Sequence, residues 1–278
     1  MKDIEILVIT KGHPFLRDPF FAIFDDMAGV NYTHVEQPAA QVFADPDLAE
    51  PYDAFVFYDM PGIDFVDNKL AGYIEPAPAF KKNFLALLAQ GKGMVFLHHA
   101  IAGWPTWPQY GEIVGGRFLY APAKVRGRDC PDSGYRHGVT HQVTKRADHP
   151  VTRDIPAHFT MTDELYLAEI FEDSVTPLLA SNFDFSAANF YSADHAVRLG
   201  KMFDNEGWQH PKGSNLVGWV KHYGQSPLVY LQGGDGPETY GNENYRRLVA
   251  NAINWVTSKE AHDWARAQNK SSFRGEKP

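Results

Sequence analysis

Two adjacent histidines, His98 and His99, follow a short apolar run at Gly93–Leu97 that reads Gly-Met-Val-Phe-Leu. The length of this run and the glycines at its start predict a buried strand with parallel neighbours. In an open α/β sheet, ligands bind beside the carboxyl ends of the strands, so both imidazoles are expected at the ligand-binding edge. There they could transfer protons or bind a metal ion. The alternative is that one histidine packs in the core and the other faces solvent.

The patterns along the chain predict an α/β fold with a single open, mostly parallel sheet flanked by helices. Short apolar runs alternate with helical patterns, and the first hundred residues have the order β-α-β-β-α-β. A hairpin around Gly224-Gln225 adds an antiparallel extension near the C-terminus. The predicted strands cover residues 4–10, 31–36, 53–58, 93–97, 137–144, 177–180, 216–223 and 227–231, and the predicted helices cover residues 19–28, 80–90 and 243–256.

Local signals mark the ends of these helices. Asp18 is expected to cap the first helix and Asn242 the last long one, because both residues can accept a hydrogen bond from a free backbone N–H. Gly91 is expected to end the middle helix. No linker divides the chain, so residues 1–258 are expected to form one domain, followed by a polar C-terminal tail at residues 259–278.

Composition and charge limit the classes of partner. The 278 residues are 44% hydrophobic and carry a net charge of −8, with a pI near 5.8. This charge argues against nucleic acid or an anionic membrane as the main partner. No apolar stretch approaches the roughly 18 residues of a membrane span, and the N-terminus enters a strand pattern rather than a signal sequence, so a cytoplasmic location is expected. The single cysteine, Cys130, excludes an internal disulfide and a cysteine metal cage.

The segment 101–135 follows the two histidines directly. It is irregular and aromatic, with Trp104 and Trp107 near its start. Long segments of this kind often form lids or pocket walls. An aromatic mini-core that covers the sheet edge is equally consistent with the sequence, because tryptophan is common in both settings. The segment 63–78 is rich in Asp, Pro and Gly and predicts a surface connection.

More titratable residues occur in the second half of the chain. His137 and His141 share one face of a predicted strand, but an i, i+4 spacing separates them by about 13 Å. We therefore expect both to be structural rather than ligands of one metal. Asp163 and Glu164 place two carboxylates beside Tyr166, and the alternative is an exposed acidic turn.

The loop at residues 232–241 is rich in glycine and contains Asp235 and Tyr240. It has no Walker lysine and no G-x-G-x-x-G spacing, so the sequence gives little support for a phosphate-binding loop.

Several short segments occur in a particular order between residues 4 and 256. They are Thr10-Lys11-Gly12-His13, Leu97-His98-His99-Ala100 with Trp104, Gly115-Gly116-Arg117-Phe118, Asp148-His149-Pro150-Val151-Thr152, Asp163-Glu164-Leu165-Tyr166, and a closing run from Gly218-Trp219 through Tyr223-Gly224, Gly233, Asp235 and Tyr240 to Trp255. In this order they resemble the ThuA-like family, which is named for a trehalose-utilisation protein. The resemblance implies a flavodoxin-like sheet similar to that of class I glutamine amidotransferases, and a role in sugar catabolism.

Two positions depart from the family pattern. Gly234 stands where such proteins often carry the histidine of a Gly-His-Asp segment, and Ala121 stands where many carry the histidine of a His-Pro segment. Both changes remove an imidazole. An amidotransferase also needs a cysteine nucleophile at a sharp strand-to-helix turn. Cys130 lies instead in an Asp-Cys-Pro-Asp loop with no apolar strand before it, so we do not expect glutamine hydrolysis.

The presumed pocket collects imidazoles and carboxylates, which suit proton transfer. The resemblance implies a carbohydrate substrate, in particular oxidised 3-keto sugars and their glycosides. A base would abstract the acidified proton next to the carbonyl, and the glycosidic oxygen would leave before water adds. The expected catalytic residues are His99 or His13 as the base, with Glu164 or Asp235 to orient it or to protonate the leaving group; the expected substrate-binding residues are His98, Trp104, Trp107, Asp163, Tyr166 and Tyr240.

A non-catalytic carbohydrate-binding or scaffold protein of the same fold is the alternative function. The histidines missing at Gly234 and Ala121 favour it, whereas the retained pair His98-His99 argues for chemistry. The sequence requires no cofactor. The sequence leaves open whether a divalent metal ion binds. The pocket is rich in histidine and aspartate, but no tight spacing such as H-E-x-x-H is present.

The expected partner is a small sugar or sugar derivative, with no nucleic acid and no membrane. Trp208 and Trp264 could lie at the interface of a homo-oligomer or could cover the core.

Overall fold

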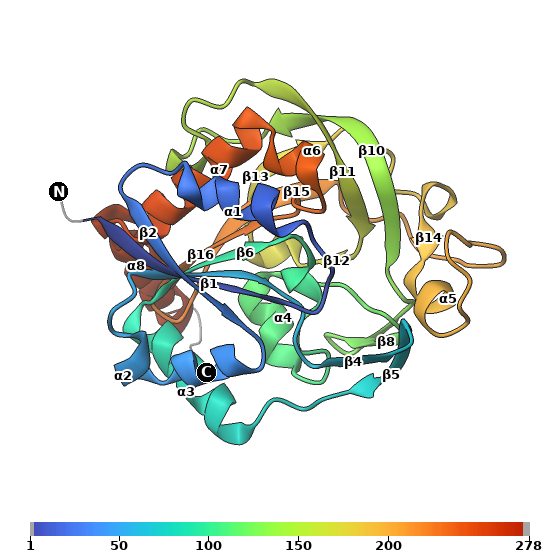
Figure 1. The fold of residues 1–278 in the computed structure, drawn as a ribbon, viewed down its shortest axis with the longest axis horizontal. Coiled ribbons are helices and arrows are strands. Elements are labelled where there is room, and N and C mark those ends of the chain that lie inside the picture. Colours follow the sequence, from blue (N-terminus) through green and yellow to red (C-terminus); the bar gives the residue numbers. More distant parts are fainter. Residues whose placement is uncertain (1–2, 275–278) are drawn as a thin grey trace.

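A ten-stranded mixed sheet forms the centre of the molecule, for which a computed structural model describes residues 3–274 (Figure 1). Neighbouring strands in this sheet are β11 (His158–Leu167), β10 (Gly134–Lys145), β13 (Thr176–Ser181), β15 (Leu216–Tyr223), β16 (Ser226–Leu231), β6 (Gly93–Leu97), β3 (Ala54–Asp59), β1 (Ile4–Lys11) and β2 (Val30–Glu36), while β14 (Tyr191–Ser192) pairs with β10.

The five strands from β16 to β2 are parallel to one another. All pairs on the other side of β16 are antiparallel. The predicted α/β sheet is therefore confirmed, with a parallel core and an antiparallel extension. This extension is larger than the predicted hairpin, because β10, β11, β13 and β14 join β15 in it.

Helices cover both faces of the parallel core. Along β1, Ile6 and Val8 belong to one buried cluster together with residues of α1 (Arg17–Asp25) and α7 (Glu243–Val256). Leu7 and Ile9 point the other way, into a cluster with residues of α3 (Pro78–Gln90) and α4 (Pro108–Val114). This alternation follows from the two-residue period of a strand. Figure 1 shows α1 and α7 on one side of the sheet and α3 and α4 on the other.

The predicted helix ends agree with the structure in two cases out of three. The Asn242 side chain accepts hydrogen bonds from the backbone N–H groups of Asn244 and Tyr245 and caps α7. Gly91 ends α3 in the left-handed conformation, with φ of +94°. The prediction for Asp18 is wrong, because α1 already begins at Arg17. Asp18 lies in the first turn, where its negative charge interacts favourably with the helix dipole.

Two segments contain more structure than we predicted. The expected surface connection at 63–78 forms the hairpin β4 (Ile63–Val66) and β5 (Lys69–Tyr73). The polar segment after residue 258 is a helix, α8 (Lys259–Arg274), which packs on β15 and β16 and buries Ala261. Trp264 of α8 packs on Trp255, so this aromatic covers the core of its own chain.

The remaining elements are short. They are α2 (Pro46–Ala49), α5 (Ala193–Val197), α6 (Pro237–Tyr240), β7 (Gly116–Arg117), β8 (Ala123–Val125), β9 (Arg128–Cys130), β12 (Glu169–Ile170), and the 3-10 turns η1 (Ala39–Ala44), η2 (His98–Ala102), η3 (Pro150–Thr152), η4 (Glu172–Ser174) and η5 (Ala187–Asn189). Within residues 3–274, no helix has both the length and the apolar character needed to cross a lipid bilayer.

Candidate active site

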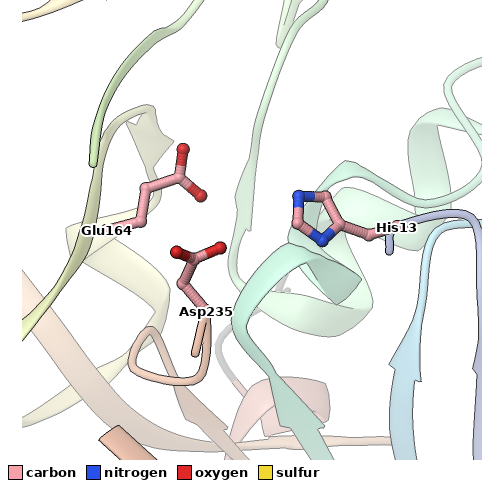
Figure 2. Close-up of side chains that lie close together, drawn as sticks. All are labelled: His13, Glu164 and Asp235. Atoms are coloured by element: carbon pink, nitrogen blue, oxygen red, sulfur yellow. The ribbon is translucent and has the colours of Figure 1, made fainter. Parts of the chain in front are cut away.

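The carboxyl ends of three parallel strands meet at one edge of the sheet, as the sequence predicted. His13 follows β1, His98 follows β6, and Asp235 lies in the loop after β16. The antiparallel strands β11 and β10 bring Glu164 and His137 to the same place. Figure 2 shows His13 facing the carboxylates of Glu164 and Asp235 from the opposite side.

His98 is fully buried behind these carboxylates. It has a φ of +48°, in the left-handed region, because the chain turns there from β6 into η2. Such a conformation costs about 1–3 kcal/mol in a residue other than glycine. Nδ1 donates to the backbone oxygen of Gln232 at 2.7 Å, and Nε2 lies 2.8 Å from the Tyr166 hydroxyl. Contacts on both ring nitrogens therefore fix the orientation of this imidazole.

The buried imidazole and its neighbours carry opposite charges. Burial lowers the pKa of His98, but the nearby carboxylates of Asp235 and Glu164, 3.7 and 3.2 Å from its Nε2, outweigh burial and raise the pKa to about 10. Burial raises the pKa of Asp235, but His137 and His98 outweigh it and hold that pKa below its usual range. A protonated His98 therefore lies behind an ionised Asp235.

His13 and His99 stack on one another, with ring centroids 4.9 Å apart. His99 is 2% exposed, and its Nε2 donates to the backbone oxygen of Tyr58 at 3.2 Å. His13 is half-buried, and its Nδ1 donates to the backbone oxygen of Pro14 at 2.8 Å, which leaves the lone pair of Nε2 facing the carboxylates. Burial lowers the pKa of both histidines. His99 thus lies behind His13 and supports its ring.

His137 is a site residue that the sequence reasoning missed. Its Nδ1 lies 3.5 Å from Glu164 Oε1 and 3.7 Å from Asp235 Oδ2. The register of β10 shifts between Arg136 and Val139, and Gly138 has a φ of +63°. This irregularity is a bulge, which redirects side chains at the end of a strand. The glycine directly after His137 was the signal that could have revealed it.

His141, its neighbour in the predicted pair, lies elsewhere. Its Nδ1 is 2.8 Å from the hydroxyl of Ser181, and burial lowers its pKa to about 4. The prediction that His137 and His141 do not share a metal agrees with this arrangement, but the structural role expected for His137 does not.

Two of the expected substrate-binding residues hold the Asp235 loop instead. The carboxylate of Asp163 accepts from the backbone N–H groups of Gly234 and Asp235, at 2.7 and 3.0 Å. The Tyr240 hydroxyl is 2.6 Å from that of Tyr58 and 3.2 Å from the backbone oxygen of Asp235. Asp163 is 5% exposed and Tyr240 is fully buried, so both are placed to position the loop rather than to touch a ligand.

The two tryptophans expected in the pocket wall lie in the core. Trp104 and Trp107 are 3% and 5% exposed and pack against Phe80. Arg117 donates to the backbone oxygens of both tryptophans. The structure therefore agrees with the aromatic mini-core, the alternative that the sequence left open for this segment.

Two adjoining cavities open at the site. The smaller one has a volume of about 120 Å³, and His13, His137, Glu164 and Tyr166 are among the residues that line it. The larger one has a volume of about 570 Å³ and extends from His13 along the loop after β1. His13 and Tyr120 both line the two cavities, so the cavities adjoin one another at these residues. A small polar molecule in the smaller cavity would lie beside both imidazoles.

One of the two positions that depart from the family pattern, Gly234, has a structural explanation. Gly234 has a φ of +136°, and a Cβ atom there would lie 2.9 Å from the hydroxyl of Tyr245 and 3.2 Å from Cβ of His98. A histidine does not fit this position without rearrangement. Cys130 is buried in a separate cluster with Phe171, and burial raises the pKa of its thiol, as expected for a cysteine with no role as a nucleophile.

Comparisons with known proteins agree with this architecture. A putative ThuA-like protein from Parabacteroides merdae has a TM-score of 0.63 and 16% identity over 92% of this chain and 91% of that one. A second, from Bacteroides uniformis, has a TM-score of 0.60 and 17% identity over 92% of both chains. A cytoplasmic protein from Salmonella typhimurium LT2 has a TM-score of 0.54 and 11% identity over 92% of this chain and all of that one. At these identities the likeness shows the fold alone.

No curated protein matches the sequence. The model of one protein family, ThuA, described as trehalose utilisation, matches residues 6–256. Trehalose utilisation is a role in carbohydrate metabolism, and the match covers most of the chain. This protein therefore belongs to the ThuA family.

Proposed function

We propose that this protein is a carbohydrate-processing enzyme that acts on oxidised (3-keto) sugars or their glycosides. A base removes the proton from the carbon next to the carbonyl, and the electron pair forms an enolate. Collapse of the enolate restores the carbonyl and breaks the bond to the glycosidic oxygen, and water adds to the resulting double bond. The family's role in carbohydrate use supports the substrate class. The observation that carries the reaction type is the cavity lined by His13, His137 and Glu164, with Asp235 beside them.

His137 is the best-placed base in this arrangement. Glu164 and Asp235 both face its Nδ1, at 3.5 and 3.7 Å, and so hold the ring with Nε2 free for a substrate proton. Such distances shorten when a substrate binds. His137 is 39% exposed, so it can exchange that proton with solvent or return it to the departing oxygen. The sequence favoured His99 or His13, but His99 is enclosed and Nε2 of His13 faces the carboxylates.

The test is the release of a phenol from an aryl 3-keto-glucoside by the wild type and by His137→Gln. Loss of a general base lowers kcat by about 10²–10⁴-fold, so we expect a loss of that size. The matched control is His158→Gln, because His158 is an exposed histidine six residues before Glu164 on β11; it should retain full activity.

Two outcomes would contradict the proposal at different levels. If His137→Gln keeps its rate, the assignment of the base is wrong. If the wild type turns over no keto sugar and no parent glycoside, the catalytic proposal fails, and a carbohydrate-binding role without catalysis becomes the better account.

We also propose a cytoplasmic location. Two proteins of similar fold from Salmonella typhimurium are named as cytoplasmic proteins, which supports this location.

A further inference from the structure

Three side chains at the site turn only hydrogen-bond acceptors toward one another. Nδ1 of His13 carries the proton, since it donates to the backbone oxygen of Pro14, and Nε2 is therefore a bare lone pair. One ligand atom from each of His13, Glu164 and Asp235 lies within 4.8 Å of the others. Carboxylates only accept when ionised. No donor from this trio lies between the three atoms, so a cation at their centre would satisfy all of them.

One oxygen of the buried Glu164 carboxylate has no hydrogen-bond partner among the described residues. Glu164 is 3% exposed, and its Oε2 accepts no hydrogen bond from the residues that the structure describes. Nε2 of His98 is 3.2 Å away, but its hydrogen bond is to the Tyr166 hydroxyl at 2.8 Å. A buried acceptor left unsatisfied costs about 1–3 kcal/mol, and more when it is charged.

The charges around the trio leave it negative. The nearest cation is the fully buried His98, whose Nε2 lies 3.2 Å from Glu164 Oε2 and 3.7 Å from Asp235 Oδ1. Asp163 adds a third carboxylate, already occupied by the backbone N–H groups of Gly234 and Asp235. The centre of the trio therefore combines acidic oxygens, an imidazole lone pair and a shortage of positive charge.

We propose that His13 Nε2, Glu164 and Asp235 bind one divalent transition-metal cation, of the Mn²⁺ or Zn²⁺ type. An imidazole suits zinc and other late metals, and carboxylates suit manganese, so the mixed set fits this class. The bond from His13 Nδ1 to a backbone carbonyl is the support that metal-binding histidines usually have. Metal–ligand bonds of about 2.0–2.2 Å place the ligand atoms of one ion about 3.4 Å apart, so the three atoms, now within 4.8 Å of one another, would move closer together when the cation binds.

The cation would also meet the need of the proposed reaction. An enolate oxygen requires positive charge beside it, and a metal ion supplies this as a Lewis acid. With only three protein ligands, coordination positions remain for water or the carbonyl oxygen, and His137 stays outside the ligand set as the base. This role rests on the proposed function, whereas the binding of the cation does not.

The experiment is isothermal titration calorimetry of chelator-treated, dialysed protein with Mn²⁺ and, separately, with Zn²⁺. We expect one ion per chain for at least one of the two metals. His13→Gln and Glu164→Gln, which keep the size of each side chain, should each weaken binding by at least about 100-fold, since even the loss of a supporting partner costs 10–100-fold. The control Glu172→Gln changes an exposed glutamate in η4 and should bind as the wild type does.

The inference is overturned if neither ion binds, or if both ligand variants bind as tightly as the wild type. The same titration separates it from the proposed function. Metal binding without turnover of any keto sugar would keep the site and reject the reaction. Turnover that persists in metal-free protein that binds neither ion would keep the reaction and reject the site.

Discussion

Replacing Asp59 by asparagine should remove a large part of the pH dependence of stability. Asp59 is the last residue of β3 and is 1% exposed. Its Oδ2 accepts a hydrogen bond from Gln37 at 2.8 Å, and its Oδ1 has no partner among the described residues. Burial raises the pKa of this carboxyl to about 7 from 3.8, against the lowering effect of the Gln37 hydrogen bond.

The sign of the effect follows from proton binding. Between pH 3.8 and about 7, the folded protein keeps a proton that the unfolded chain releases, so a rise in pH favours the unfolded state. Above the folded pKa both states are ionised and this contribution stays constant. With these two pKa values, the wild type loses about 3 kcal/mol of unfolding free energy between pH 5 and pH 8 through this one group. The Asp59→Asn variant cannot ionise at this position, so it loses none of this unfolding free energy.

The assay is urea unfolding of the wild type and Asp59→Asn at pH 5, 6, 7 and 8, followed by tryptophan fluorescence. The quantity to compare is the difference in unfolding free energy between the two proteins, because His141 and other groups titrate equally in both. Asp129→Asn is the control, since that side chain is 87% exposed. A difference between wild type and Asp59→Asn that stays constant from pH 5 to pH 8 would refute the reasoning.

Two further predictions concern the helix and the strand that support the site. Asn242→Ala removes the acceptor for two backbone N–H groups at the start of α7 and should cost about 1 kcal/mol in urea unfolding; an unchanged midpoint would show that the cap contributes nothing. Gly93→Ala places a Cβ against the backbone oxygen of Val256 and should cost about 1–3 kcal/mol through overpacking. Thermal unfolding measures this cost, and a melting temperature equal to that of the wild type would contradict the close approach.

Features that depend on neighbours in the sequence were predictable. The run at 93–97 is a central strand because its apolar residues and β-type pattern are local, and Asn242 caps α7 because a cap needs only the next three residues. The placement of His13 and His98 at one edge also followed, since parallel strands bring their carboxyl ends together. The same local reasoning failed for Asp18, because the helix begins at Arg17, two residues before its predicted start at residue 19.

The part played by each site residue depended on contacts between distant segments. His137 reaches the carboxylates because β10 bulges beside β11, and Asp163 holds the loop after β16 because that loop presents two N–H groups to it. The role of the tryptophans depended on their burial. The sequence does not show whether Trp104 packs against Phe80, as it does in the structure, or contacts a ligand.

The sequence by itself determined the open α/β sheet, the edge at which the histidines gather and the chemical types available there, because these follow from local pattern and from the rule that parallel strands share one end. Only the tertiary structure decided which imidazole is enclosed, as His99 is, and which lines a cavity, as His13 and His137 do. The physical reason is that burial, hydrogen-bond partners and the pKa shifts they cause arise between residues far apart in the chain.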